Sequence, residues 1–142
     1  MFALTADPID AAAVRAAVSD PRFGAILVFE GVGRDGPSSS RVVHLSYEAY
    51  PELAIPVMEA IAAAAAERYG AKVAMVHRTG VVGVGEASLV IAVGTPHRGE
   101  CYEASRYVIE QVKQRLPVWK KEIRSDGSEW KANTPAGEPA GR

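Results

Sequence analysis

The chain has 142 residues, a length that suits one domain with a single core. Hydrophobic residues make up 48% and charged residues 23%, which is close to a globular average and argues against disordered, collagen-like and coiled-coil chains. Lysine and arginine (16) nearly balance aspartate and glutamate (17), so the formal net charge is -1 and we expect no surface for nucleic acid or anionic membrane. Any basic binding site must therefore be confined to a small part of the surface.

The single cysteine forms no intramolecular disulfide, and the three histidines show no ligand spacing. We therefore expect no metal and no cofactor. The first ten residues carry acids and no basic region, and no apolar run approaches the roughly 18 residues of a membrane span. The sequence predicts a cytoplasmic protein without a targeting or anchoring segment.

In the first third of the chain, residues 2–5 form a short apolar run that predicts a strand. Asp7-Pro8 predicts an N-cap and the start of a helix that continues to about Val18. The continuous apolar run 24–30 predicts a buried, central strand. Residues 31–40 are rich in glycine and serine and predict a surface loop, and the alternation over 43–48 predicts a strand with one wet face.

A helix is predicted from Tyr50-Pro51 to Tyr69-Gly70, with Pro56 causing a bend or a later start. Its apolar stripe comprises Leu53, Val57, Met58, Ile61 and Ala65. Residues 72–78 and 87–93 predict two strands joined by a glycine-valine turn over 80–85.

The last long helix is predicted to start at Thr95-Pro96 and to end at Pro117. Its apolar face comprises Cys101, Ser105, Val108, Val112 and Leu116. Residues 118–123 alternate like a strand, 125–127 form a turn and 129–131 return as a short partner. The order of elements predicts an α+β fold with a mixed or antiparallel sheet, two long helices and a short N-terminal helix, in one domain over 1–132 with a frayed tail over 133–142.

Gly31-Val32-Gly33-Arg34-Asp35-Gly36 matches the dinucleotide-binding pattern G-x-G-x-x-G. That motif needs a helix that starts at the glycines and receives the pyrophosphate. Here the segment leads into another strand, so a dinucleotide site is not expected.

Thr95-Pro96-His97-Arg98 places two cationic side chains at the start of a helix, where the macrodipole disfavours each by roughly 0.3–1 kcal/mol. A bound anion such as a phosphate would explain the arrangement. The alternative is a solvated turn in which Glu100 or Glu103 neutralises Arg98. The residues alone leave both interpretations open.

Lys113, Lys120 and Lys121 form a second basic group, for which a solvated face is the usual explanation. The strand period puts Lys120 on the opposite face from Lys121, so at most one of this pair enters a pocket, and Lys120 is better placed. His97 and Lys113 are separated by about 24 Å along one helix at a rise of about 1.5 Å per residue. If both serve one site, two chains must contribute to it.

Cys101 lies on an apolar helix face and is expected to be structural, with a catalytic thiol near the helix N-terminus as the alternative. His44 and His77 are expected to be surface or packing residues.

Several segments together resemble one family, the large catalytic subunit of molybdopterin synthase, the MoaE family. These segments are Phe29-Glu30-Gly31-Val32-Gly33-Arg34, Leu45-Ser46-Tyr47-Glu48-Ala49-Tyr50-Pro51-Glu52, Val76-His77-Arg78-Thr79-Gly80, Gly85-Glu86, Pro96-His97-Arg98 and Leu116-Pro117-Val118-Trp119-Lys120-Lys121-Glu122. The resemblance implies an α/β-hammerhead fold and a homodimer at the centre of a heterotetramer. It also implies a small ubiquitin-like sulfur-carrier subunit of the MoaD type at each end, whose C-terminal Gly-Gly thiocarboxylate supplies two sulfurs to cyclic pyranopterin monophosphate.

The resemblance further assigns roles to residues of this chain. It implies that Lys113 and Lys120 act at the reacting centre, and that the substrate is bound by Arg34, His97, Arg98, Lys121, Glu122, Val32 and Gly33. Cationic side chains suit a substrate that carries a phosphate and a reaction that develops negative charge. The chain departs from the family pattern at Asp35-Gly36-Pro37, at Pro56 and after Trp130, where Arg142 is the remaining basic candidate.

Two other classes of function remain as alternatives. One is a non-catalytic dimeric module that binds a phosphorylated small molecule through Arg34, His97 and Arg98. The other is an enzyme that depends on Cys101.

Overall fold

The computed structural model describes residues 1–35, 41–127 and 129–133. Residues 36–40 of the expected loop and residues 134–142 of the expected tail, including Arg142, lie outside this range. The strands of the described residues form two four-stranded sheets. The first has the order β1-β4-β6-β2 and comprises β1 (Phe2–Thr5), β4 (Lys72–Arg78), β6 (Ala87–Thr95) and β2 (Ala25–Val32). β1 and β4 are parallel and the other pairs are antiparallel, so the predicted mixed α+β class is confirmed.

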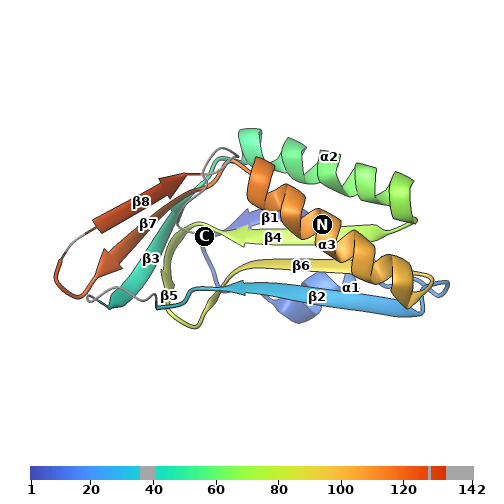
Figure 1. Ribbon diagram of the computed structural model, residues 1–142, viewed down its shortest axis with the longest axis horizontal. Coiled ribbons are helices and arrows are strands. Elements are labelled where there is room, and N and C mark those ends of the chain that lie inside the picture. The colour runs from blue at the N-terminus through green and yellow to red at the C-terminus, as the bar shows by residue number, and fades with distance from the viewer. Residues whose placement is uncertain (36–40, 128, 134–142) are drawn as a thin grey trace.

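The second sheet is antiparallel and has the order β5-β3-β7-β8. Its strands are β5 (Gly80–Gly83), β3 (Val42–Glu48), β7 (Trp119–Arg124) and β8 (Glu129–Asn133). In Figure 1 this sheet leaves one end of the first sheet at an angle. The chain enters it directly from β4 through Gly80, whose φ of 80° lies in the left-handed region that favours glycine. We call the region where the two sheets meet the sheet junction.

The first sheet is covered on both faces. α2 (Pro51–Tyr69) and α3 (Arg98–Arg115) lie together on one face, and α1 (Ala11–Ala16) packs on the other (Figure 1). Successive strand residues point to opposite faces, so on β4 Met75 joins the cluster beneath α2 and α3 whereas Val76 joins the cluster beneath α1. Both faces of the central strands are therefore buried, which explains their continuous apolar sequence.

α1 begins later than the sequence predicted. The side chain of Asp10 accepts a hydrogen bond from the backbone N–H of Ala13 at 3.1 Å and caps the helix, which starts at Ala11. The expected cap at Asp7-Pro8 is wrong because a better-placed aspartate follows it.

α2 starts at Pro51 and runs through Pro56, so the later start considered for this helix is wrong. Gly70 ends the helix in the left-handed conformation, with a φ of 65°, as predicted. The buried stripe includes Ala54, whereas Leu53 is 52% exposed.

β2 is an edge strand whose residues are all half-buried or exposed, so the expected buried, central position is wrong. Its apolar run reflects packing of α3 on one face and α1 on the other, while its outer edge pairs with no strand of the described residues. Leu27 and Val28 remain 37% and 38% exposed. A strand covered on both faces looks central in sequence even when one edge is open.

The segment expected as a simple turn between β4 and β6 is partly a strand. β4 and β6 pair antiparallel, but Gly80–Gly83 forms β5 and pairs with β3 in the second sheet.

On β3 the register shifts between Val42 and His44, and Val43 is 53% exposed although the alternation placed it on the apolar face. The C-terminal pair β7 and β8 confirms the predicted strand, turn and return.

None of the helices in the described ranges is long and apolar enough to cross a membrane. The same ranges contain no group of three or more His, Cys, Asp or Glu side chains that could hold a metal ion.

Candidate functional site

Arg34 follows β2 at the sheet junction. The Gly33 N–H donates to the Glu86 carbonyl at 3.2 Å, and the Gly33 carbonyl accepts from the Gly85 N–H at 2.8 Å. A Cβ at position 33 would lie 2.5 Å from Cδ1 of the buried Leu45, so any larger residue would have to displace that side chain. The exposed Arg34 therefore leaves from a backbone position that is fixed against the β5–β6 turn.

The β5–β6 turn is held by Arg78, a residue that is only 6% exposed. Its Nη1 donates to Glu86 Oε1 at 3.2 Å, and its Nη2 donates to the Ala6 and Val81 carbonyls at 3.2 and 3.1 Å. Glu86 Oε1 also accepts from the Gly83 N–H at 3.0 Å. This backbone bond, followed by Arg78, lowers the pKa of the Glu86 carboxyl. The buried Arg78 guanidinium thus connects the carbonyls of Ala6 and Val81 with Glu86, which belongs to the turn that contacts Gly33.

On β7, the basic residues divide between two faces as predicted. Lys120 Nζ lies 3.9 Å from Glu122 Oε2, and Arg124 Nη2 donates to Glu122 Oε1 at 2.8 Å, so these three side chains share one face. Lys121 lies on the other face, with its Nζ 3.6 Å from Glu129 Oε1 across the strand pair. Glu122, whose side chain is 16% exposed, therefore compensates two cations.

Tyr47 on β3 and His77 on β4 connect the two sheets. Their rings meet edge to face with centroids 5.1 Å apart. Burial, with a smaller contribution from the Lys113 charge, lowers the pKa of His77 to about 4. Tyr47 is the Cα partner of Lys120 in the β3–β7 register. Lys113 is exposed in the last turn of α3.

Arg34 lies at the same end of the first sheet as this aromatic pair. Leu89 is the register partner of both His77 on β4 and Gly31 on β2, so these residues form one row across the sheet. The row places the start of the Arg34 segment at the same end of the first sheet as His77.

His97 and Arg98 lie at the other end of α3. His97 is the N-cap, with an extended backbone and no side-chain capping bond, and Arg98 is the first helical residue. In the described part of the chain, no salt bridge joins Arg98 to Glu100 or Glu103. Arg98 and Lys113 are about 22 Å apart along the helix at about 1.5 Å per residue. Figure 1 shows α3 starting far from the second sheet and ending beside β7.

The thiol of Cys101 is fully buried, and its Sγ donates to the Val93 carbonyl at 3.3 Å. A buried thiol on α3 that is hydrogen-bonded to β6 fits the structural interpretation of this residue.

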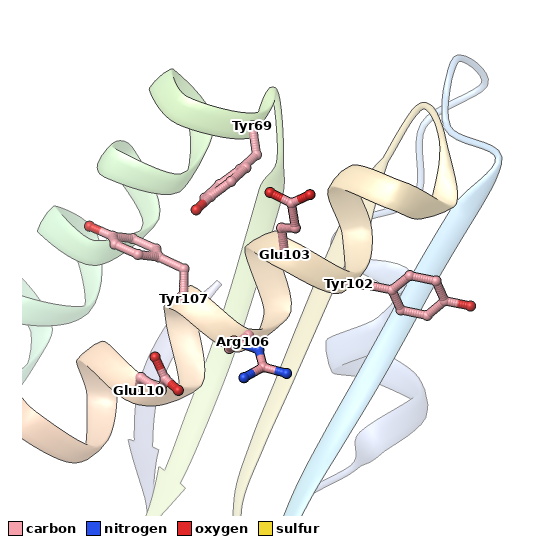
Figure 2. Close-up of a pocket in the computed structure, with 6 residues that line it drawn as sticks. All are labelled: Tyr69, Tyr102, Glu103, Arg106, Tyr107 and Glu110. Carbon is pink, nitrogen blue, oxygen red and sulfur yellow. The ribbon is translucent and has the colours of Figure 1, made fainter.

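A pocket of about 360 Å³ opens on the surface of α3 and the end of α2 (Figure 2). It is lined by Tyr69, Tyr102, Glu103, Arg106, Tyr107 and Glu110. The Arg68 guanidinium lies 4.5 Å from the Tyr107 ring centroid and 5.6 Å from that of Tyr69. Both tyrosine rings therefore already make a cation–π contact within this chain. None of the residues predicted for the site lines this pocket.

Sequence reasoning identified the charged residues of the junction and missed the residues that support them. It gave no role to Tyr47 or Arg78 and placed His77 among surface or packing residues. The available signal was their position inside the segments Leu45–Glu52 and Val76–Gly80, which carry the family resemblance.

Comparisons with known proteins agree with one another. The MoaE protein family matches residues 4–115. The molybdopterin synthase catalytic subunit of Bacillus subtilis is 43% identical over 130 residues, which cover 91% of this chain and 83% of that protein. The molybdopterin synthase catalytic subunit 1 of Mycobacterium tuberculosis is 41% identical over 133 residues, which cover 93% of this chain and 90% of that protein.

Solved structures show the same fold. The crystal structure of molybdopterin synthase from Staphylococcus aureus superposes with a TM-score of 0.86 at 32% identity, covering 90% of this chain and 93% of the matched chain. The sequence match and the two-sheet architecture lead to one assignment: the chain belongs to the MoaE family of molybdopterin synthase catalytic subunits.

Proposed function

We propose that this chain transfers two sulfur atoms to cyclic pyranopterin monophosphate and so forms the dithiolene of molybdopterin. The sulfur arrives as the C-terminal Gly-Gly thiocarboxylate of a small ubiquitin-like, MoaD-type partner subunit. The chain needs no nucleophilic cysteine for this reaction, in keeping with the buried Cys101. The single cysteine suits a reducing cytoplasm, where we propose that the reaction occurs.

The observation that supports this proposal is that α3 carries Lys113 in its last turn and leads directly into β7, which carries Lys120. Once the thiocarboxylate sulfur has bonded to the pterin, water cleaves the acyl–sulfur bond, which leaves the sulfur on the pterin and a carboxylate on the partner. The attack of water develops negative charge on the carbonyl oxygen, and a lysine ammonium stabilises that charge. Lys113 is exposed, and Lys120 is held beside Glu122 with its side chain 31% exposed. These two lysines are therefore the proposed catalytic groups.

Arg34, His97 and Arg98 are the proposed substrate-binding residues. Each arginine is a bidentate donor for phosphate, and the His97 imidazole offers a further hydrogen-bonding group beside Arg98. Val32 and Gly33 would contribute through the backbone that leads into Arg34. Glu122 would orient Lys120 through their 3.9 Å contact. Lys121 is left out of the proposed direct contacts, since its side chain lies on the opposite face beside Glu129.

We further propose that the site is shared by two copies of the chain within a heterotetramer. β2 has an open outer edge among the described strands and exposes Leu27 and Val28. An antiparallel pairing of β2 with the β2 of a second copy would reverse that copy's direction. Its His97 and Arg98 would then approach the junction that holds Lys113 of the first copy.

The proposed function is tested by mixing the purified chain with its thiocarboxylated partner and the cyclic pterin and measuring molybdopterin. We expect product from the wild-type protein and a loss of about a hundredfold or more for Lys113→Ala. Arg115→Ala removes an exposed cation from the same helical turn and should retain activity. Absence of product with verified thiocarboxylate would contradict the proposal, and full activity of Lys113→Ala would support the non-catalytic binding module instead.

A further inference from the structure

Arg34 lies between two residues that are hydrogen-bonded to different parts of the fold. On its N-terminal side, the buried Gly33 makes two backbone hydrogen bonds with the β5–β6 turn, one with Gly85 at 2.8 Å and one with Glu86 at 3.2 Å. On its C-terminal side, Asp35 bonds the start of β3 through its side chain. The backbone of Arg34 is therefore held on both sides.

The Asp35 carboxylate makes two contacts with the chain at the start of β3. Its Oδ1 accepts a hydrogen bond from the backbone N–H of Val42 at 3.0 Å, and its Oδ2 lies 3.5 Å from Nε of Arg41. Val42 is 5% exposed and lies beyond the end of β5, which pairs with residues 44–47 of β3. Asp35 thus supplies an acceptor for the N–H of a buried residue with which β5 does not pair.

The start of β3, to which Asp35 is bonded, is itself held by the second sheet. The N–H of Arg41 donates to Ser125 Oγ at 3.2 Å, and the Arg41 carbonyl accepts from the Ser125 N–H at 2.7 Å. Ser125 directly follows β7. The Asp35 side chain therefore attaches the Arg34 segment to a hydrogen-bonded part of the second sheet.

The carboxylate of Asp35 does not neutralise its neighbour in the sequence. Its salt bridge is with Arg41, and Arg34 takes part in none of the salt bridges between the residues that the structure describes. Arg34 is also exposed. Its guanidinium is therefore available to an anion from solution, while its backbone is held in place.

We propose that Asp35 is a positioning residue for substrate binding: its hydrogen bond to Val42 holds the Arg34 segment in the conformation that presents the guanidinium to the substrate phosphate. The inference rests on the proposed substrate-binding role of Arg34 and identifies the residue that supports it. A segment that is already ordered loses less conformational entropy when the substrate binds, so the hydrogen bond lowers KM. Asp35 acts through Arg34 and not on the reacting atoms.

Three substitutions separate the hydrogen bond of Asp35 from its charge. Asp35→Ala removes both, Asp35→Asn keeps an oxygen that accepts from Val42, and Arg41→Gln removes only the exposed ion pair. In the reconstituted synthase, we expect the KM for the cyclic pterin to rise about fivefold in Asp35→Ala, with kcat within about twofold. Asp35→Asn and Arg41→Gln should keep KM within about twofold of the wild-type value.

A double variant tests whether Asp35 acts through Arg34. Arg34→Ala should raise KM by more than Asp35→Ala does. Adding Asp35→Ala to Arg34→Ala should change KM by less than about twofold, because the guanidinium to be positioned is already absent. Multiplied effects in the double variant would show that Asp35 acts independently of Arg34 and would overturn the inference.

The single variants separate this inference from the proposal on which it rests. A wild-type KM in Asp35→Ala, or an equal rise in Asp35→Asn, would overturn the role of the Asp35 hydrogen bond. A wild-type KM in Arg34→Ala would instead contradict the proposed binding role of Arg34. Molybdopterin formation by the wild-type protein in the same assay tests the proposed function itself.

Hydrogen exchange at the Val42 amide provides a measurement that does not depend on activity. We expect slow exchange in the wild-type protein, exchange at least about tenfold faster in Asp35→Ala, and a rate near wild type in Asp35→Asn. Equal rates in the wild-type and Asp35→Ala proteins would show that the carboxylate does not bond Val42 in solution, and the inference would fail.

Discussion

At the scale of single residues, His77 couples the stability of the fold to pH. Its folded-state pKa is about 4, whereas a histidine in the unfolded chain titrates near 6.5. Between these values the unfolded chain binds a proton that the folded chain does not. The contribution of His77 to the free energy of unfolding is therefore fully present above about pH 6.5, and up to about 3 kcal/mol is lost as the pH falls to about 4.

This coupling predicts a difference between wild type and His77→Gln in urea unfolding. From about pH 7 to about pH 4.5, the wild-type protein should lose about 2–3 kcal/mol more of its unfolding free energy than the variant, which has no proton to bind at this position. Carboxylates titrate in the same range in both proteins and cancel in the difference. His44→Gln is the matched control and should keep the wild-type slope. Parallel pH profiles for wild type and His77→Gln would show that His77 is not buried in a neutral form.

At the scale of secondary-structure elements, Arg78 joins segments that are distant in sequence. It bonds the carbonyl of Ala6 after β1, the carbonyl of Val81 in β5 and the carboxylate of Glu86 in the β5–β6 turn. The same turn bonds Gly33, which precedes Arg34. The position of Arg34, a proposed substrate-binding residue, thus depends on the buried Arg78.

Replacement of the buried guanidinium predicts a large loss of stability. Arg78→Met removes the donor of three hydrogen bonds, two to part-buried carbonyls and one to the Glu86 carboxylate, and we expect the free energy of unfolding to fall by about 2–4 kcal/mol. Glu86→Gln keeps an oxygen that accepts from Gly83 and Arg78, and the Glu86 side chain is 56% exposed, so its loss should be much smaller. Chemical denaturation of both variants measures the difference. Equal losses would mean that the exposed ion pair, and not the backbone contacts of Arg78, stabilises the turn.

At the scale of the whole molecule, α3 separates the basic residues into two groups. Lys113 lies at the sheet junction, and Arg98 lies about 22 Å away at about 1.5 Å of rise per residue. No single small substrate spans this distance within one chain. A site that uses both groups must therefore be completed by a second copy, and the open edge of β2 offers a surface for the pairing.

A shared site predicts recovery of activity when two inactive variants are combined. In a one-to-one mixture of Arg98→Ala and Lys113→Ala subunits after reassortment, half of the dimers are hybrids with one intact site each, so about a quarter of the wild-type activity should return. The control pairs Lys113→Ala with Lys120→Ala, whose hybrids carry a defect in each site and should stay inactive. Molybdopterin formation measures both mixtures. Failure of the first mixture to recover would show that each chain builds its site alone.

The sequence by itself determined most of the elements and the identity of the charged residues. Alternation and helical periodicity depend on local backbone geometry, so α2, α3, β3 and β7 could be predicted from short segments. The division of Lys120 and Lys121 between two faces of a strand follows from the same rule and is confirmed by their different partners. The separation of His97 from Lys113 followed from helix rise alone.

Tertiary structure decided everything that depends on contacts between distant segments. β2 is an edge strand because nothing in the described chain pairs with its outer side, and β5 is a strand because β3 supplies the hydrogen bonds that Gly80–Gly83 lacks on its own. Tyr47 and His77 are 30 residues apart in the chain and meet only because two sheets join there. Burial and strand pairing are set by what surrounds a residue, and no local pattern records those surroundings.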